Sequence, residues 1–164
     1  CLMNAMDANL QVAATEGVLC IKITGPANFN ATPGFKSIVK RLCTEAGHTL
    51  LLDLTDCITM DSTFLGVLAS LSQRLEKPIE MLNPSERIND LLDNLGVLEL
   101  FRIDQGDNPL VGRLDETETP EANKREMTET SLEAHKALMA LNPENIPRFK
   151  DVAKFIEEDL KRQE

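Results

Sequence analysis

The hydrophobic residues of this chain fall into two patterns, short continuous runs and runs spaced as on one face of a helix. Continuous runs rich in β-branched and aliphatic residues are typical of buried strands. They predict strands at 18–24, 50–54, 79–82 and 100–103, with 10–13 as a candidate hairpin partner of the first. The run at 50–54 is apolar on both faces apart from Asp53, as in parallel strands that helices cover on both sides, so we expect it to be central.

Three helices are predicted between these strands, because apolar residues recur there with a period near 3.6. The segment 55–60, before the second helix, is expected to be a loop. Strands that alternate with helices in this way predict an α/β sheet. Capping and breaking residues mark the helix starts at Thr32 with Pro33, at or beside Ser62, and at Asn83 with Glu86, and the ends at Gly47, Pro78 and Gly96.

Charge and composition exclude several classes of partner. The 164 residues carry 17 basic and 27 acidic side chains, a net charge of -10. A protein without a basic patch gains little from phosphate contacts, so neither nucleic acid nor an anionic membrane is an expected partner. The chain has no Trp, no Tyr and six Phe, which leaves little material for stacking on bases or sugar rings.

The cysteines and histidines indicate no metal site and no cofactor. Four cysteines are widely spaced without a C-x-x-C motif, and two histidines, His48 and His135, stand alone. This pattern favours neither a zinc site nor a disulfide scaffold, so a reducing cytoplasm is the expected location. No apolar run approaches the roughly 20 residues that span a bilayer.

Enzyme signatures are missing from the sequence. It contains no phosphate-binding loop, no G-x-G-x-x-G, no nucleophile elbow and no H-E-x-x-H motif. We assign no role to either histidine. The acidic residues Asp53, Asp56 and Asp61 have the oxygen ligands that Mg²⁺ prefers, although helix caps and satisfied carboxylates explain them more simply. We therefore expect no enzymatic activity.

The sequence from Asp53 to Thr63 runs from a hydrophobic strand into an acidic segment and then into a helix. This is the carboxyl end of a strand, where α/β proteins place functional residues. In one interpretation Asp61 or Ser62 only caps the helix. In the other, the Ser62 hydroxyl is a phosphorylation site, and the added negative charge beside Asp56 and Asp61 changes what the surface binds.

Residues 10–112 resemble the STAS domain of bacterial anti-sigma-factor antagonists. The most specific part is Asp61-Ser62-Thr63 followed by Leu65-Gly66-Val67, which is similar to the family pattern at the start of a helix. The other matching segments are Val18-Leu-Cys-Ile-Lys-Ile-Thr-Gly25, Leu51-Leu-Asp-Leu and Asn83-Pro-Ser through to Gly96.

The resemblance implies a STAS-type mixed sheet of four to five strands with helices packed on it. It also implies that an anti-sigma factor with serine kinase activity phosphorylates Ser62, that the unphosphorylated form binds this partner, and that a serine phosphatase reverses the modification. The residues expected to contact the partner are Asn28, Asp56, Asp61, Ser62 and Thr63.

Two departures from the family pattern favour an alternative. Asn28 stands where many members have an acidic residue, and Phe64 replaces a small residue, either as a core residue or as an exposed anchor. STAS domains without phosphorylation serve as constitutive scaffolds in signalling or transport complexes. The alternative hypothesis, which the added C-terminal segment also favours, is that this chain is such a scaffold.

The composition changes after Val111, so we expect a STAS domain at 1–114 and a helical C-terminal extension at 115–164, beginning with a polar stretch at 115–121. Two helices are predicted in the extension, as a hairpin or as separate docking helices. They could cover the Ser62 surface, extend it or mediate self-association. The residues expected to bury apolar surface, against the domain or against a partner, are Leu138, Leu141, Phe149, Val152 and Ile156.

Overall fold

The computed structural model describes residues 8–117 and 123–163, and its first elements are the two strands of an antiparallel hairpin, β1 (Asn9–Thr15) and β2 (Val18–Ala27). Gly17 lies in the tight turn between them with φ of 85°, a conformation that glycine adopts at no steric cost. The expected hairpin partner at 10–13 is thereby confirmed. The ten residues of β2 make it long enough to pair with two further strands, one after the other.

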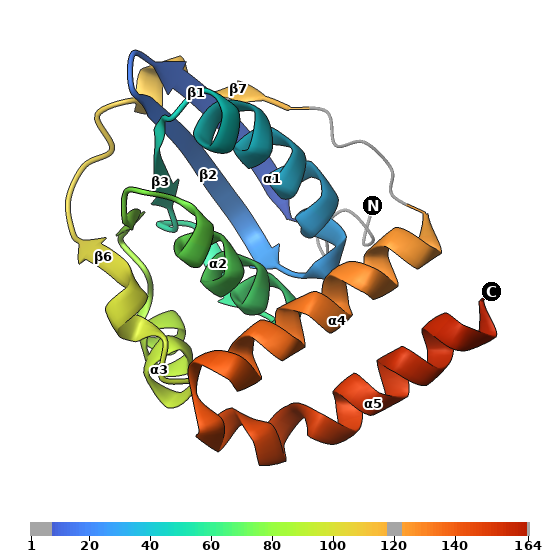
Figure 1. Cartoon of the computed structure of the whole chain (residues 1–164). Helices are drawn as coiled ribbons and strands as arrows, with labels where there is room; N and C mark the ends of the chain where they lie inside the picture. Colours follow the sequence, from blue (N-terminus) through green and yellow to red (C-terminus); the bar gives the residue numbers. More distant parts are fainter. Residues whose placement is uncertain (1–7, 118–122, 164) are drawn as a thin grey trace.

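The strand β3 (Thr49–Asp53) lies between β2 and β5 and is parallel to both, so the prediction of a central strand is confirmed. The order across the sheet is β6, β5, β3, β2, β1 and β7 (Figure 1). The remaining strands on this path are β5 (Ile79–Leu82), β6 (Phe101–Asp104) and β7 (Asp115–Glu116).

The segment expected to be a loop, 55–60, contains a strand, β4 (Cys57–Met60). After a turn at Thr55 and Asp56, the chain pairs with the second half of β2, with Gly25 opposite Cys57 and Ala27 opposite Met60. Only the neighbouring strand identifies this segment, because four residues carry too little periodicity. The described residues form a sheet of seven strands rather than four to five, while the mixed α/β fold is confirmed.

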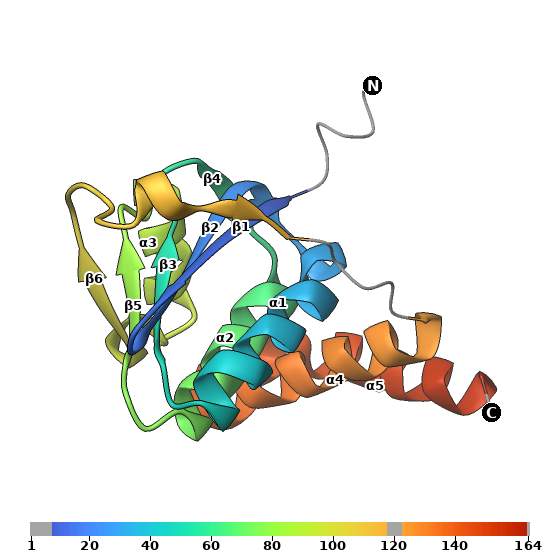
Figure 2. The ribbon, with the colours of Figure 1, turned by 90° about the horizontal axis from the view of Figure 1, so that it is seen from above.

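Helices α1 and α2 pack against one face of the sheet, and α4 and α5 form a further layer beyond them (Figure 2). Within the described residues, no helix combines the length and the apolar composition needed to cross a bilayer. The α-helices are α1 (Thr32–Val39), α2 (Ser62–Arg74), α3 (Glu86–Asn94), α4 (Lys124–Leu141) and α5 (Ile146–Arg162). A π-helical turn, η3 (Lys40–Glu45), extends α1, and short 3₁₀ turns are η2 (Phe29–Ala31), η4 (Leu98–Leu100), η5 (Val111–Arg113) and η6 (Pro143–Asn145).

Two of the predicted helix caps are wrong. Thr32 lies inside α1, and its hydroxyl donates to the carbonyl of Phe29 in the preceding 3₁₀ turn. The N-cap of α3 is Ser85, whose Oγ accepts from the Ile88 amide at 3.2 Å. Asn83 instead has φ of 55° and bonds to the backbone of Gly106 through both ends of its side-chain amide. In both cases an adjacent turn, invisible in the local sequence, moves the cap.

The predicted C-terminal helices are α4 and α5, which pack side by side and which we call the C-terminal hairpin. Leu138 is fully buried and Phe149 is partly buried against the core, as expected, whereas Val152 is 44% exposed, so the domain itself does not bury this side chain. The expected polar stretch at 115–121 begins with the two residues of β7, and residues 118–121 lie outside the described part of the chain.

Phe64 is a core residue, as one of the two sequence interpretations proposed. It is fully buried, and its ring lies 5.0 Å from that of Phe35 on α1, centroid to centroid, at a tilt of 48°. Tilted aromatic pairs at this distance add to the energy of apolar burial. Phe64 therefore joins α2 to α1 beneath the surface on which Ser62 lies.

We expect Phe64→Ala to lower the free energy of unfolding by about 3–5 kcal/mol, the usual cost of emptying a buried aromatic site. Chemical denaturation measures the change. Phe155→Ala is the matched control, because Phe155 is 63% exposed and should change stability little. Equal losses in the two variants would contradict the assignment of Phe64 to the core.

Candidate functional site

Asp61 connects the start of α2 to the end of β2. As the N-cap of α2, it accepts the Phe64 amide on Oδ1 at 2.8 Å and the Phe29 amide on Oδ2 at 2.8 Å. Its own amide donates to the carbonyl of Ala27 at 3.0 Å. The interpretation of Asp61 as a helix cap is correct. The same carboxylate also fixes the position of the loop that follows β2.

Asn28 and Phe29 lie next to Asp61, in the loop that follows β2. Asn28 is the N-cap of η2, and its Oδ1 accepts the Asn30 amide at 3.1 Å. The Phe29 side chain is 46% exposed, although its amide is held by Asp61. Half-exposed aromatic side chains are common contact residues at protein interfaces. The sequence analysis did not single out Phe29, and its position three residues before the Thr-Pro pair at 32–33 is the signal that could have done so.

Ser62 is the first residue of α2, and helix α4 partly covers it. Its Oγ lies 2.8 Å from Nε2 of His135, while Nδ1 of the same ring lies 2.7 Å from the carbonyl of Ser131. A carbonyl only accepts, so Nδ1 carries a proton, and in the neutral ring Nε2 accepts the proton of the Ser62 hydroxyl. His135 is buried, and its ring packs edge-on against Phe149 of α5.

His135 is a second residue of the candidate site to which the sequence analysis gave no role. The available signal was its position on the apolar face of a predicted helix, one turn before Met139 and three residues before Leu138. A histidine on a buried face needs hydrogen-bond partners for both ring nitrogens. Nothing in the sequence shows that Ser62, 73 residues earlier, is one of these partners.

The contact between α2 and α4 is close because small residues face each other. A Cβ atom added to Gly66 would overlap the backbone of Ala134, so the glycine permits the approach of the two helices. One turn away, the hydroxyl groups of Thr63 and Ser131 are 3.0 Å apart. Thr63 is therefore buried beneath α4 rather than exposed.

The turn of the C-terminal hairpin is bound at the end of α3. The fully buried Asn145 donates from Nδ2 to the carbonyls of Leu95 and Leu138, each at 2.9 Å. Arg148 donates to the carbonyl of Asn94 at 3.0 Å. The carbonyls of Asn94 and Leu95, which the end of α3 leaves without helical partners, are satisfied in this way.

The three carboxylates considered above as Mg²⁺ ligands, those of Asp53, Asp56 and Asp61, have separate partners. Asp53 is buried and accepts from the amide and hydroxyl of Thr55 and from Asn108 Nδ2, at 2.6–3.0 Å. Asp56 forms an ion pair of 2.9 Å with Lys22, at the other end of β4 from Asp61. Among the described residues, no group of three acidic, histidine or cysteine side chains could hold a metal ion.

Of the five residues predicted to bind a partner, the structure brings Asn28, Asp61, Ser62 and Thr63 together. Asp56 lies apart from them, at the turn between β3 and β4. We call the patch formed by Asn28, Phe29, Asp61 and Ser62, beneath which Thr63 is buried, the Ser62 surface. A groove of about 560 Å³ opens beside it, between η2, α2 and the C-terminal hairpin. Its lining residues include Phe29, Thr63, Met127, Ser131 and Ile156.

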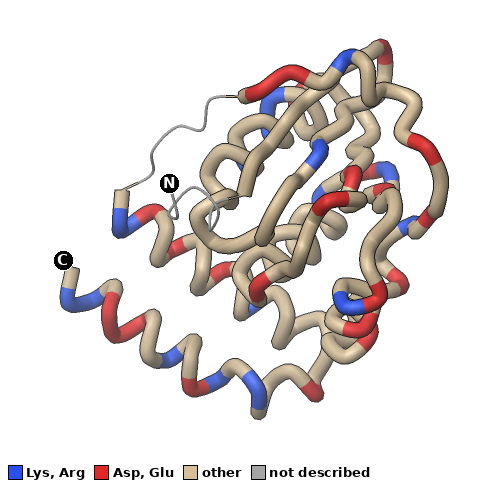
Figure 3. Tube along the Cα trace, turned by 180° about the vertical axis from the view of Figure 1, so that it is seen from behind, with Lys and Arg blue, Asp and Glu red and all other residues tan. Residues whose placement is uncertain are grey.

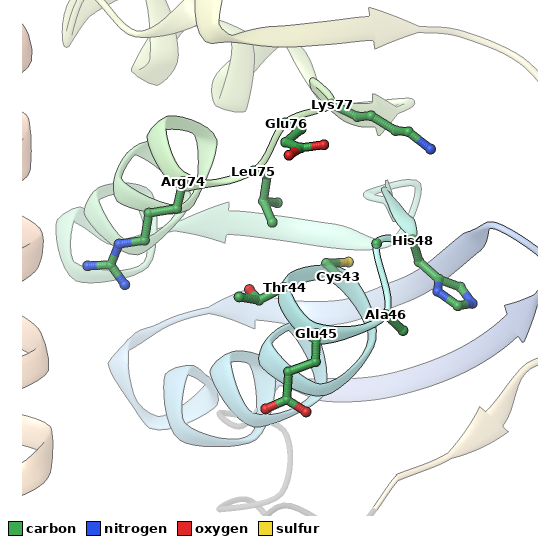
Figure 4. Close-up of a pocket in the computed structure, with 10 residues that line it drawn as sticks. Cys43, Thr44, Glu45, Ala46, His48, Arg74, Leu75, Glu76 and Lys77 are labelled. Carbon is green, nitrogen blue, oxygen red and sulfur yellow. The ribbon is translucent and has the colours of Figure 1, made fainter.

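A second cavity, of about 350 Å³, lies at the far end of α2 from Ser62 (Figure 4). Arg74, Lys77 and His48 line it, but their side chains point in different directions and do not converge on a common point. Binding sites for small polar ligands need convergent polar groups. The chemistry of this protein is therefore better sought at the Ser62 surface.

Residues 9–107 match the STAS domain, and because this is well over half of the chain, the protein belongs to the STAS domain family. It is 27% identical over 105 residues to the anti-sigma-B factor antagonist of Staphylococcus epidermidis, covering 62% of this chain and 96% of that protein. The anti-sigma-B factor antagonist of Staphylococcus aureus is 23% identical over the same coverage.

Solved structures show the same fold. The anti-sigma factor antagonist SpoIIAA in its unphosphorylated form superposes with a TM-score of 0.54 at 16% identity, covering 62% of this chain and 91% of that one. A putative anti-sigma factor antagonist from Thermotoga maritima gives 0.52 at 18% identity, covering 63% and 90%. The family match stops at residue 107, before α4.

We expect Asp61→Ala to lower the free energy of unfolding by about 1–2 kcal/mol, because both backbone amides that its carboxylate accepts lose their partner. Asp61→Asn keeps one acceptor oxygen and should fall between this variant and the parent. Chemical denaturation of the three proteins gives the order. A neutral effect of Asp61→Ala would contradict the role of Asp61 in joining β2 to α2.

Asp53 makes stability depend on pH. Burial raises the pKa of its carboxyl group, but hydrogen bonds from Thr55 and Asn108 and the charge of Lys22 outweigh burial, so the pKa lies below its usual value. The ionised Asp53 carboxylate stabilises the fold fully above its pKa in the unfolded chain, about 3.9. This stabilisation is lost as the pH falls through the lower pKa of the folded protein.

Asp53→Asn should therefore destabilise the protein more at about pH 6 than at about pH 3, when unfolding free energies are compared by denaturation. The exposed Asp90 of α3 offers the matched control, Asp90→Asn, whose effect should vary little between the two conditions. A destabilisation by Asp53→Asn that grows towards low pH would show the opposite sign and refute the assignment.

Proposed function

We propose that this chain is a protein-binding component of a partner switch, similar in function to anti-sigma factor antagonists. Its unphosphorylated form binds an anti-sigma factor with serine kinase activity, phosphorylation of Ser62 ends the binding, and a serine phosphatase restores it. The observation that carries the proposal is the position of Ser62, first in α2 directly after the Asp61 cap and beside the Asn28 loop. Membership of the STAS family and the named function of its Staphylococcus relatives support it.

The electrostatics of the Ser62 surface suit such a switch. A phosphoserine adds about 1.5 to 2 negative charges near neutral pH. The helix start favours this charge through its dipole and free amides, while the Asp61 carboxylate, one residue away, opposes it. The surface gains negative charge without losing its fold, so phosphorylation can change partner affinity and leave the domain intact.

Several features favour binding over catalysis and a protein over nucleic acid as the partner. The Ser62 surface combines the half-exposed Phe29 with polar side chains, as protein interfaces do. Along α5, basic residues are interspersed with acidic ones rather than gathered into a basic face (Figure 3). The buried cysteines Cys20, Cys43 and Cys57 are free, which fits a protein that acts in the reducing cytoplasm.

A second candidate function is a constitutive STAS scaffold, which the hydrogen bond between Ser62 and His135 favours. In this structure the Ser62 hydroxyl bonds to His135 of α4, a helix of the same chain. A serine that α4 always covers would serve only to hold that helix. The two functions differ in whether partner affinity responds to charge at residue 62.

The test is the affinity of the anti-sigma factor of the same organism for three variants, measured by calorimetry. We expect Ser62→Asp to weaken binding at least tenfold, because it places charge beside Asp61. Ser62→Ala should bind but take up no phosphate from the kinase and ATP. Ser37→Asp is the control, since Ser37 is an exposed serine on α1.

If Ser62→Asp and Ser37→Asp bind the anti-sigma factor equally well, the scaffold function replaces the switch. Phosphate found only at other residues after incubation with kinase and ATP would have the same meaning. Mass spectrometry of the phosphorylated peptide identifies the modified residue in either case.

A further inference from the structure

We infer that the C-terminal hairpin is a removable cover over Ser62, and that α4 must leave α2 before a kinase can phosphorylate this serine. The inference rests on the proposed function, because it takes Ser62 as the phosphorylated residue. It adds an intramolecular contact that controls when phosphorylation can occur.

The first argument is that the hydroxyl group to be phosphorylated is already engaged. Ser62 Oγ lies 2.8 Å from His135 Nε2, and the imidazole belongs to a helix that crosses directly over the start of α2. In phosphoryl transfer the acceptor oxygen must face the γ-phosphate in line and give its proton to a base of the kinase. With α4 in place, the His135 ring lies against this oxygen and holds its proton, so the oxygen is not free to face a γ-phosphate.

The second argument is that contacts from both helices of the hairpin fix His135 in its position over Ser62. The ring of His135 packs against Phe149 of α5 with centroids 5.2 Å apart, and its Nδ1 bonds to the Ser131 carbonyl. Next to His135, Ala134 touches the backbone of Gly66. A change anywhere along this series of contacts should alter the exposure of Ser62.

The third argument is that a related protein has the domain without the hairpin. The Staphylococcus epidermidis relative is matched over 96% of its length by 62% of this chain, and the family match ends at residue 107. The helices from Lys124 onward therefore lie on a face that a complete STAS domain presents without them. Thr63 and Val67, each 6% exposed here, belong to that face.

The fourth argument concerns the nature of the contact. Next to Ser62 it consists of two hydrogen bonds, Ser62 to His135 and Thr63 to Ser131, and of small side chains at Gly66 and Ala134. Water replaces hydrogen bonds of this kind when a contact opens, so their net contribution is modest. A partner that binds α2 can therefore displace α4 at this end.

The experiment measures access to residue 62 in the full chain, independently of any kinase. In a background of Ser62→Cys and Cys1→Ser, the thiol introduced at position 62 is titrated with 5,5′-dithiobis(2-nitrobenzoate). Ala134→Glu places a charged side chain against the backbone of Gly66 and should lift α4. Ala140→Glu is the matched control, the same substitution at an exposed alanine of the same helix.

We expect Ala134→Glu to speed the reaction of the introduced thiol at least tenfold and Ala140→Glu to leave it unchanged. The native cysteines test whether the core stays folded, because Cys20, Cys43 and Cys57 are buried. Burial also raises the pKa of Cys43 and Cys57 to about 11, so these thiols react only when the domain opens. If the introduced thiol reacts equally fast with and without Ala134→Glu, the inference is overturned.

A second pair of variants serves if Ala134→Glu exposes the native cysteines. Phe149→Ala removes the ring that packs on His135, and Phe155→Ala changes an exposed phenylalanine of the same helix. Phe149→Ala should speed the labelling of the introduced thiol severalfold, and Phe155→Ala should not. Equal labelling rates of the introduced thiol in these two variants would contradict the inference that the hairpin covers residue 62.

The last measurement uses native Ser62, the serine-kinase anti-sigma factor of the same organism and ATP. Faster phosphorylation of Ser62 in Ala134→Glu than in Ala140→Glu supports the inference, whereas equal phosphorylation of both overturns it and leaves the proposed function standing. If Ser62 takes up no phosphate in any variant although the thiol introduced at this position is accessible, the proposed function fails. The labelling rates then still report whether α4 covers residue 62.

Discussion

The close contact between α2 and α4 is the interaction on which the arrangement around Ser62 depends. Gly66 has no side chain, so the backbone of α4 can lie directly against α2 at Ala134. At this separation His135, the residue after Ala134, reaches Ser62, one turn before Gly66. Ser131, one turn earlier in α4, reaches Thr63. A larger residue at position 66 would separate the helices and break both polar contacts.

Ser62 is positioned by one part of the chain and covered by another. The pairing of β4 with β2 brings the Asp61 amide to the carbonyl of Ala27, and the Asp61 side chain then fixes the first turn of α2. None of these contacts involves the C-terminal hairpin. The position of Ser62 can therefore persist when α4 moves. A surface that α4 covers at one time and a partner binds at another must keep its geometry in this way.

The negative charge of the chain has a more specific distribution than its total indicates. Asp53 is held within the sheet by Thr55 and Asn108, and Asp56 is paired with Lys22. Both stabilise the turn between β3 and β4 rather than form the Ser62 surface. The carboxylate closest in sequence to a negative charge added at Ser62 is that of Asp61. Its two oxygens already accept hydrogen bonds from backbone amides.

The sequence by itself determined the central strand, the start of α2 at Ser62 and the presence of two C-terminal helices. It also gave a core position as one of two possibilities for Phe64. These features depend on local patterns of apolar residues and on capping residues within a few positions of one another. The same patterns misplaced the caps at Thr32 and Asn83, because the turns that precede them depend on contacts with other segments. The strand β4 escaped prediction since only β2 defines it.

The tertiary structure alone decided where the C-terminal helices pack. An amphipathic helix shows in its sequence that it packs on something, but the sequence allowed a cover, an extension of the surface or self-association. The choice depends on a glycine at position 66 and an alanine at 134, two residues without strong local preferences that matter only when they meet. His135 and Ser62 likewise have no pattern in common along the chain, and they form a pair because close packing of two helices places their side chains within hydrogen-bond distance.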